Sequence, residues 1–172
     1  FDTLLINFGN TNYLYNNKLI KGIINVTFSG NYRDSLSVIT TTFDNFYINN
    51  KLIQGEMIVT NNGKNNSQNL FYNIDVNNAS INTDNGIINW QSNRIRELIA
   101  GGETYLDDSD DVYRITGIST GNAANGNGFS VEIIDPLHMD QSCLPYCVIT
   151  SGSSKISPNV YPTRTIYYGD ST

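Results

Sequence analysis

The sequence predicts an all-β fold, an antiparallel meander of about ten strands that forms a strongly curved sheet, a flattened barrel or a sandwich. Apolar and polar residues alternate along most of the chain with the period of two that is typical of strands, and a helical period is almost absent. The connecting segments are short and rich in Asn and Gly, which favours hairpins over crossover helices. A sheet with this many strands is expected to curl, close or split into two layers.

Each alternating segment ends at turn residues. Tight turns are expected at 49–51 (NNK) and 84–86 (DNG), and longer polar turns at 61–69 and 122–128. The only helical candidate is 93–101, which ends in Gly-Gly. The predicted strands are 3–9, 18–30, 37–49, 51–61, 70–76, 79–84, 86–98, 111–121, 128–136, 146–157 and 163–169.

Two stretches of the chain, NNKLIKGIINVTFSGN (16–31) and NNKLIQGEMIVTNNGK (49–64), align without a gap. A solenoid needs at least three stacked copies, so we interpret the pair as one hairpin unit used twice in one sheet. Each copy is expected to be the second strand of a hairpin, after 3–9 in the first case and 37–49 in the second. Gly22 is expected at a bulge or bend.

Composition limits the class of protein. Hydrophobic residues make up 39% and charged residues 15%, which excludes a disordered chain, and the net charge of −6 argues against nucleic-acid binding. The apolar stretches are shorter than the roughly 20 residues of a membrane span. Because the chain opens at Phe1 without a signal peptide, we interpret residues 1–172 as one all-β domain processed from a longer protein.

The expected core follows from the alternating apolar positions. Trp90, the only tryptophan, is expected to pack against a second layer, although a tryptophan beside tyrosines could also stack on sugar rings. The predicted core residues are Ile24, Val26, Phe28, Ile39, Phe43, Ile58, Ile74, Ile88, Trp90, Ile115 and Val131.

The acidic segment YLDDSDDVY (105–113) is the one candidate metal site. Calcium prefers several oxygen ligands, which Asp107, Asp108, Asp110 and Asp111 could supply, but Val112 stands where an EF-hand needs Gly. The favoured interpretation is a solvated loop in which two of these aspartates, Asp110 and Asp111, pair with the nearby arginines Arg94 and Arg96. No cofactor other than calcium is indicated.

His138 is the only histidine, and a catalytic role would join it to Asp135 or Asp140. A single histidine cannot supply the common catalytic zinc sites, and no nucleophile motif is present. We therefore expect a loop histidine without a special role, in a protein that is not an enzyme.

Several motifs in order resemble a family of uncharacterised lipoproteins of the Bacteroidetes. They are ITTTFDNFYINN in the first half, NWQSNRIRE and DDVYRITG in the middle, and RTIYYGD at the end, so the resemblance covers nearly the whole chain. It implies an exported protein that is associated with the outer membrane, the periplasm or the cell surface. It also implies an N-terminal lipid anchor and a final C-terminal strand with a cysteine, both outside this chain.

The resemblance suggests two kinds of covalent modification. Cys143 and Cys147 are disulfide candidates, and Cys147 is the one expected to pair with the cysteine of the missing strand. Three sites fit, or nearly fit, the pattern that Bacteroidetes use for protein O-glycosylation: Thr3, Ser35 and Ser171, of which Ser35 lies in a predicted turn.

The expected function is that of a non-enzymatic accessory or protein-interaction module of the cell envelope, with a protein partner. The alternative is a carbohydrate-binding module that uses exposed aromatic side chains. Neither nucleic acid nor direct membrane contact is expected, apart from the lipid anchor.

Overall fold

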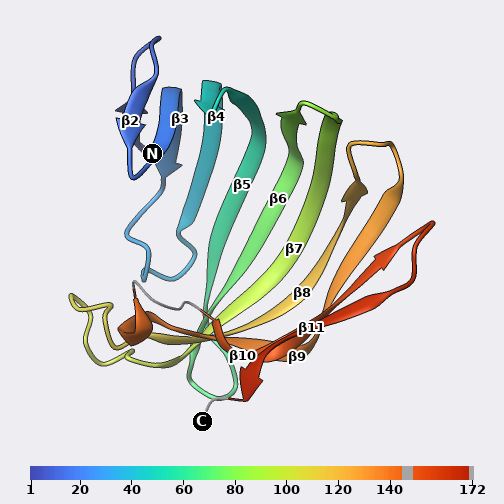
Figure 1. Ribbon diagram of the computed structural model, residues 1–172. Coiled ribbons are helices and arrows are strands. Elements are labelled where there is room, and N and C mark those ends of the chain that lie inside the picture. The colour runs from blue at the N-terminus through green and yellow to red at the C-terminus, as the bar shows by residue number, and fades with distance from the viewer. Residues whose placement is uncertain (145–148, 171–172) are drawn as a thin grey trace.

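A computed structural model describes residues 1–144 and 149–170, and within them it forms a single antiparallel sheet (Figure 1). The strand order is β1-β3-β4-β5-β6-β7-β8-β9-β10-β11, and β2 also pairs with β3. The elements are β1 (Asp2–Asn7), β2 (Tyr13–Tyr15), β3 (Lys18–Phe28), β4 (Val38–Ile48), β5 (Lys51–Lys64), β6 (Leu70–Thr83), β7 (Gly86–Ala100), β8 (Val112–Asn122), β9 (Gly128–Asp140), the 3-10 helix η1 (Gln141–Cys143), β10 (Ile149–Pro158) and β11 (Arg164–Asp170).

The predicted all-β meander is confirmed, in the form of a strongly curved open sheet. Figure 1 shows that the blue edge, β1 and β2, and the red edge, β11, do not meet, so the sheet is not closed into a barrel. No helix in the described part of the chain is long and apolar enough to span a membrane.

Three details of the predicted elements were wrong. The helical candidate 93–101 belongs to β7, which continues to Ala100. The predicted strands 70–76 and 79–84 are one strand, β6, interrupted by a bulge between Val76 and Ala79. β9 continues past Pro136 to Asp140.

The repeat begins with a tight turn made by two asparagines. Asn16 and Asn17 have φ of 46° and 59°, and Asn49 and Asn50 have φ of 50° and 62°. A two-residue hairpin turn of type I′ needs positive φ at both positions, and asparagine tolerates it well. Both copies are therefore second strands of hairpins, as predicted. In the first copy the hairpin partner is β2, whereas the segment predicted for that role forms β1 and pairs farther along β3.

Each copy then places a glycine at a break in register. Gly22 has φ +96° and Gly55 has φ +124°, and the pairing shifts at both positions. A Cβ atom on Gly22 would lie 2.1 Å from the Asn45 carbonyl oxygen, and one on Gly55 would lie 2.6 Å from the Ala79 Cα. These glycines let the bulged strand approach its neighbour closely, and bulges increase the local twist of a sheet. The repeat thus encodes a hairpin with a built-in bend.

The register sorts side chains into two faces. We call one the apolar face; its members include Ile24, Val26, Phe28, Ile39, Phe43, Met57, Val59, Ile74, Val76, Trp90, Ile115 and Val131. We call the other the polar face; its members include Asn25, Thr27, Thr40, Thr42, Thr60, Asn73, Asp75, Asn89, Gln91, Asn93, Thr120, Asn122 and Ser130.

The buried core occupies only one end of the apolar face. Its members are Val59, Tyr72, Leu98 and Tyr113, and of the predicted core residues Ile39, Ile74 and Ile115 pack against it. The other eight predicted core residues are only half-buried, and Ile58 lies on the polar face. The prediction failed for them because every pair of elements in extensive contact consists of neighbours in the sheet, so no second layer covers Trp90 among the described residues.

The accessible surface is large for the mass. It measures 10615 Å² for a chain of 19.1 kDa, whereas a compact monomer of that mass exposes about 8,400 Å². In a two-layer domain a second layer covers one face of the sheet, whereas here that face stays accessible. This accounts for the excess of roughly 2,200 Å².

The Tyr72 side chain is fully buried, and its hydroxyl has no hydrogen-bond partner among the described residues. Burial raises its pKa well above the usual range. Because an unpaired buried hydroxyl is costly, Tyr72→Phe should leave the free energy of unfolding unchanged or raise it by about 1 kcal/mol. The matched control is Tyr113→Phe, which removes a 2.7 Å bond to Asp111 and should cost roughly 1.5–3 kcal/mol. Urea denaturation of both variants checks this, and a marked loss of stability in Tyr72→Phe would contradict it.

Candidate functional site

The loop between β7 and β8 carries the predicted calcium ligands. The carboxylate of Asp111, at the end of this loop, is held by two protein side chains. The Arg33 Nη2 atom donates to both carboxylate oxygens of Asp111, at 2.8 and 2.9 Å, and the Tyr113 hydroxyl donates to Oδ2. The Asp111 side chain is 1% exposed and the Arg33 side chain 8%. The predicted pairing with Arg94 and Arg96 is therefore wrong for Asp111, because Arg33 arrives from the distant β3–β4 loop.

The other aspartates of this loop shape its turns. Asp107 accepts hydrogen bonds from the Ser109 backbone and hydroxyl at 3.0 and 2.6 Å, and these bonds lower the pKa of its carboxyl. Asp110 accepts from the Thr104 hydroxyl at 2.8 and 2.9 Å, and among the described residues it forms no ion pair with Arg94 or Arg96. Within residues 1–144 and 149–170, no three acidic, His or Cys side chains are placed to hold a metal ion, and Asp108 does not join the others in such a group.

Arg96 lies among three tyrosines at the same end of the sheet. Its guanidinium carbon is 5.4, 5.8 and 5.0 Å from the ring centroids of Tyr32, Tyr72 and Tyr113, and its Nη2 atom donates to the Tyr32 hydroxyl. Tyr32 stacks on Tyr72 with centroids 4.5 Å apart. Burial raises the pKa of all three phenols, so they stay neutral around the cation. This cluster fastens the β3–β4 loop to the apolar face.

Glu97 plays the same fastening role on the other face. Its Oε1 atom accepts hydrogen bonds from the side-chain amides of Asn69 and Asn65, both at 2.8 Å, and Arg114 donates to Oε2. The bond from Asn69 is the main reason that the pKa of this carboxyl is lowered. Glu97 thereby ties the turn between β5 and β6 to β7.

The lowered pKa of Glu97 predicts a loss of stability in acid. A carboxylate whose folded pKa lies below its unfolded value, roughly 4.3, contributes stability above that pH, and the contribution is lost as the pH falls through the folded pKa. Urea denaturation at pH 7 and pH 3 should show a smaller acid-induced loss for Glu97→Gln than for the unchanged protein. Equal losses in the two proteins would contradict this prediction.

His138 lies in β9 and not in a loop, and neither candidate carboxylate binds it. Its Nδ1 atom is 2.9 Å from the Ser151 hydroxyl on β10. Asp135 accepts a hydrogen bond from Ser153 at 2.6 Å, while Asp140 accepts from the backbone of Ser142 and caps η1. The structure therefore does not assemble the His–Asp pair that a catalytic role would need.

The candidate modification sites are spread over the molecule. Cys143 is in a disulfide bond, and Cys147 lies outside the described residues, so its predicted pairing stays a prediction. Thr3 on β1 and Ser35 in the β3–β4 turn are both exposed, as a glycosylation site requires. Ser171 lies outside the described residues.

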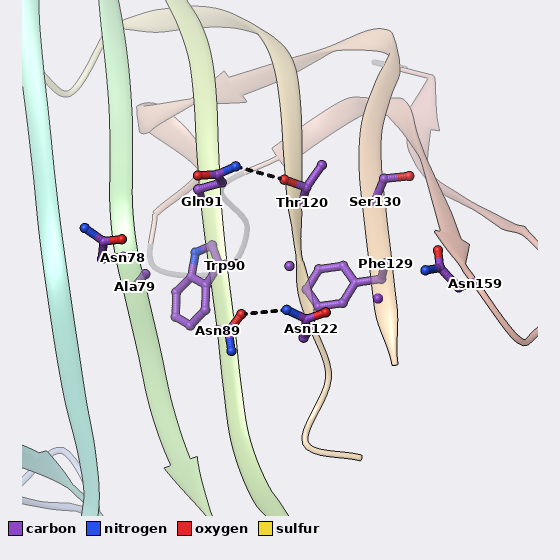
Figure 2. A pocket seen from close by; sticks show the side chains of 12 residues that line it. Asn78, Ala79, Asn89, Trp90, Gln91, Thr120, Asn122, Phe129, Ser130 and Asn159 are labelled. Carbon is purple, nitrogen blue, oxygen red and sulfur yellow. Dashed lines mark hydrogen bonds between the residues drawn. The ribbon is translucent and has the colours of Figure 1, made fainter. Parts of the chain in front are cut away.

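A hollow of about 700 Å³ lies across β6–β9, at the other end of β7 from Arg96 (Figure 2). Its floor is formed where Ala79, Trp90, Gly121 and Phe129 face one another across four strands. We call it the amide pocket, after the side-chain amides of Asn89, Gln91, Asn122 and Asn159. Thr120 and Ser130 add hydroxyl groups to its lining.

Alternation decides which side chains enter the amide pocket. In β7, Asn89 and Gln91 point to the polar face, and Trp90 between them points to the apolar face. The ring of Phe129 also lies on the apolar face, over Gly121, where a Cβ atom would come within 2.9 Å of the ring. Sequence reasoning singled out Trp90, which does line the pocket, but it missed the polar neighbours Asn89 and Gln91; the signal for them was the alternation of polar residues around Trp90.

Comparison with known proteins gives no family for this chain, since no protein-family model, curated protein or solved structure matches it.

Proposed function

We propose that this protein is a non-enzymatic interaction module of the bacterial cell envelope, and that its apolar face packs against a partner protein. The observation that carries the proposal is the half-exposed apolar face, together with an excess surface of roughly 2,200 Å². Stable protein interfaces bury about 1,200–2,000 Å² in total, so the uncovered face is large enough for a specific complex. The envelope location rests on the resemblance to Bacteroidetes lipoproteins.

The chemistry of the face defines the partner. Val26, Met57, Val76 and Val131 lie in one cross-strand row with only small hydroxyl side chains between them, and Met57 remains 37% exposed. Such a surface needs an apolar counterpart, because burying apolar area is what drives association. With a net charge of −6, the chain favours a partner whose interface is flanked by basic side chains.

The test places a photo-crosslinking amino acid at one position on each face and produces the protein in its native host. Met57 reports on the apolar face, and Ile118, which is 54% exposed on the polar face, is the matched control. A single protease-sensitive adduct from Met57, with none from Ile118, is the expected result.

Two results would overturn the proposal. The first is the absence of an adduct from Met57, or the same adducts from both positions. The second is an adduct with the mass of two copies of this chain, which would show that a second copy and not a different protein covers the face.

A further inference from the structure

We propose that the amide pocket binds a neutral carbohydrate chain. The amides that carry this inference, Asn89, Gln91 and Asn122, lie on the polar face, so it rests on other side chains than the partner proposed for the apolar face. Among the described residues, the lining of the pocket contains amide and hydroxyl side chains together with Ala79, Trp90 and Phe129, and no Asp, Glu, Lys, Arg or His. A phosphate, a carboxylate or a metal ion would find no opposite charge there, which leaves neutral polar ligands.

Cross-strand hydrogen bonds hold the amides in place. Asn122 donates from Nδ2 to the Asn89 Oδ1 atom at 3.1 Å, and Gln91 donates from Nε2 to the Thr120 hydroxyl at 3.5 Å, as the dashed lines in Figure 2 show. A primary amide has two N–H donors and an oxygen with two lone pairs, so each keeps capacity for a ligand after its cross-strand bond. Pre-positioned donors and acceptors reduce the entropy lost on binding.

A glycine lets one more amide into the pocket. Gly128 pairs with Asn122, and a Cβ atom on Gly128 would lie 2.6 Å from the Asn159 Nδ2 atom. The Asn159 side chain therefore occupies the place that any larger residue at position 128 would take. Amide groups thus reach the pocket from β7, from β8 and from the segment after β10.

The size and surroundings of the pocket suit a chain of sugars. A volume of about 700 Å³ falls within the roughly 300–1,000 Å³ of ordinary ligand pockets. A second hollow of about 270 Å³ shares Gln91 and Thr120 with it and adds the exposed side chain of Ile118 and one acidic side chain, Asp75, at the far end from the amide pocket's neutral lining. The two hollows form a continuous strip. The hydroxyl groups of a sugar chain would contact the amides there, and the C–H face of a sugar ring would contact Ile118. A purely apolar ligand would leave the amides without partners, which is unfavourable.

Affinity electrophoresis tests this with soluble polysaccharides in the gel: a glucan, a mannan, a galactan and arabinoxylan, with polygalacturonate as the anionic control. The test variant is Asn89→Ala combined with Asn122→Ala. The matched control is Asn25→Ala, which removes an amide from the same face on β3, away from the pocket. Thermal unfolding of each variant checks that it is folded.

At least one neutral polysaccharide should retard the unchanged protein and Asn25→Ala equally. Loss of two amides should raise the dissociation constant of the double variant by roughly tenfold or more. The inference is overturned if no neutral polysaccharide retards the protein, if the double variant binds as well as the control, or if polygalacturonate binds best.

Discussion

Replacing Asp111 with alanine is expected to lower the free energy of unfolding by about 3–5 kcal/mol. The substitution leaves the guanidinium of Arg33, whose side chain is 8% exposed, without its carboxylate in the protein interior. It also removes the acceptor for the Tyr113 hydroxyl. Urea denaturation followed by the fluorescence of Trp90, the only tryptophan, measures the effect.

Two further variants separate the buried ion pair from ordinary loss of charge. Glu132→Ala breaks the exposed pair with Lys155, whose side chains are 60% and 41% exposed, and should cost less than about 1 kcal/mol. Replacing both buried partners, as Arg33→Met with Asp111→Leu, should recover part of the stability, because no unpaired charge remains. If Asp111→Ala were as mild as Glu132→Ala, the buried pair would not fasten the loops.

Gly55→Ala should lower the free energy of unfolding by roughly 3 kcal/mol or more. Alanine is strained at φ +124°, and its Cβ atom would lie 2.6 Å from the Ala79 Cα on the neighbouring strand. Gly22→Ala should behave alike, because Gly22 also has a positive φ of +96° and an added Cβ atom would lie 2.1 Å from the Asn45 carbonyl oxygen. Both variants are measured by urea denaturation.

Two other glycines serve as controls for this effect. Gly126 has φ +82° with nothing within 4 Å of an added Cβ atom, so Gly126→Ala measures backbone strain alone and should cost about 1 kcal/mol. At Gly102, where the nearest side-chain atom would be 3.6 Å away, alanine should be almost neutral. Equal losses in the free energy of unfolding for Gly55→Ala and Gly102→Ala would mean that the close approach of the strands at Gly55 does not require glycine.

The local features of the fold could be predicted well from the sequence. Alternation located the strands, NNK at 49–51 located a tight turn, and Gly22 was expected where the bulge lies. Local pattern failed at β6, because a bulge at Asn78, with φ 50°, interrupts the alternation without ending the strand. It also failed at 93–101, where Leu98 is buried and the chain stays extended.

The candidate sites were harder to predict because their partners are distant in sequence. Arg33 and Asp111 are 78 residues apart, and no local pattern links them. The core was misplaced for a related reason: alternation shows that a residue faces one side of a sheet, but not whether anything covers that side. Trp90 attracted attention as a rare residue and does line the pocket, but the common Asn and Gln beside it, which also line it, were overlooked.

The unbroken order of the meander has a consequence for how this chain folds. From β4 to β11 each strand pairs only with its immediate neighbours in sequence, and extensive contacts follow the same order. Loop closure between such neighbours costs little entropy, so assembly can start at any hairpin and extend outward one strand at a time. The sheet then resembles a one-dimensional array, in which cooperativity passes from neighbour to neighbour and the outermost strands are the first to open.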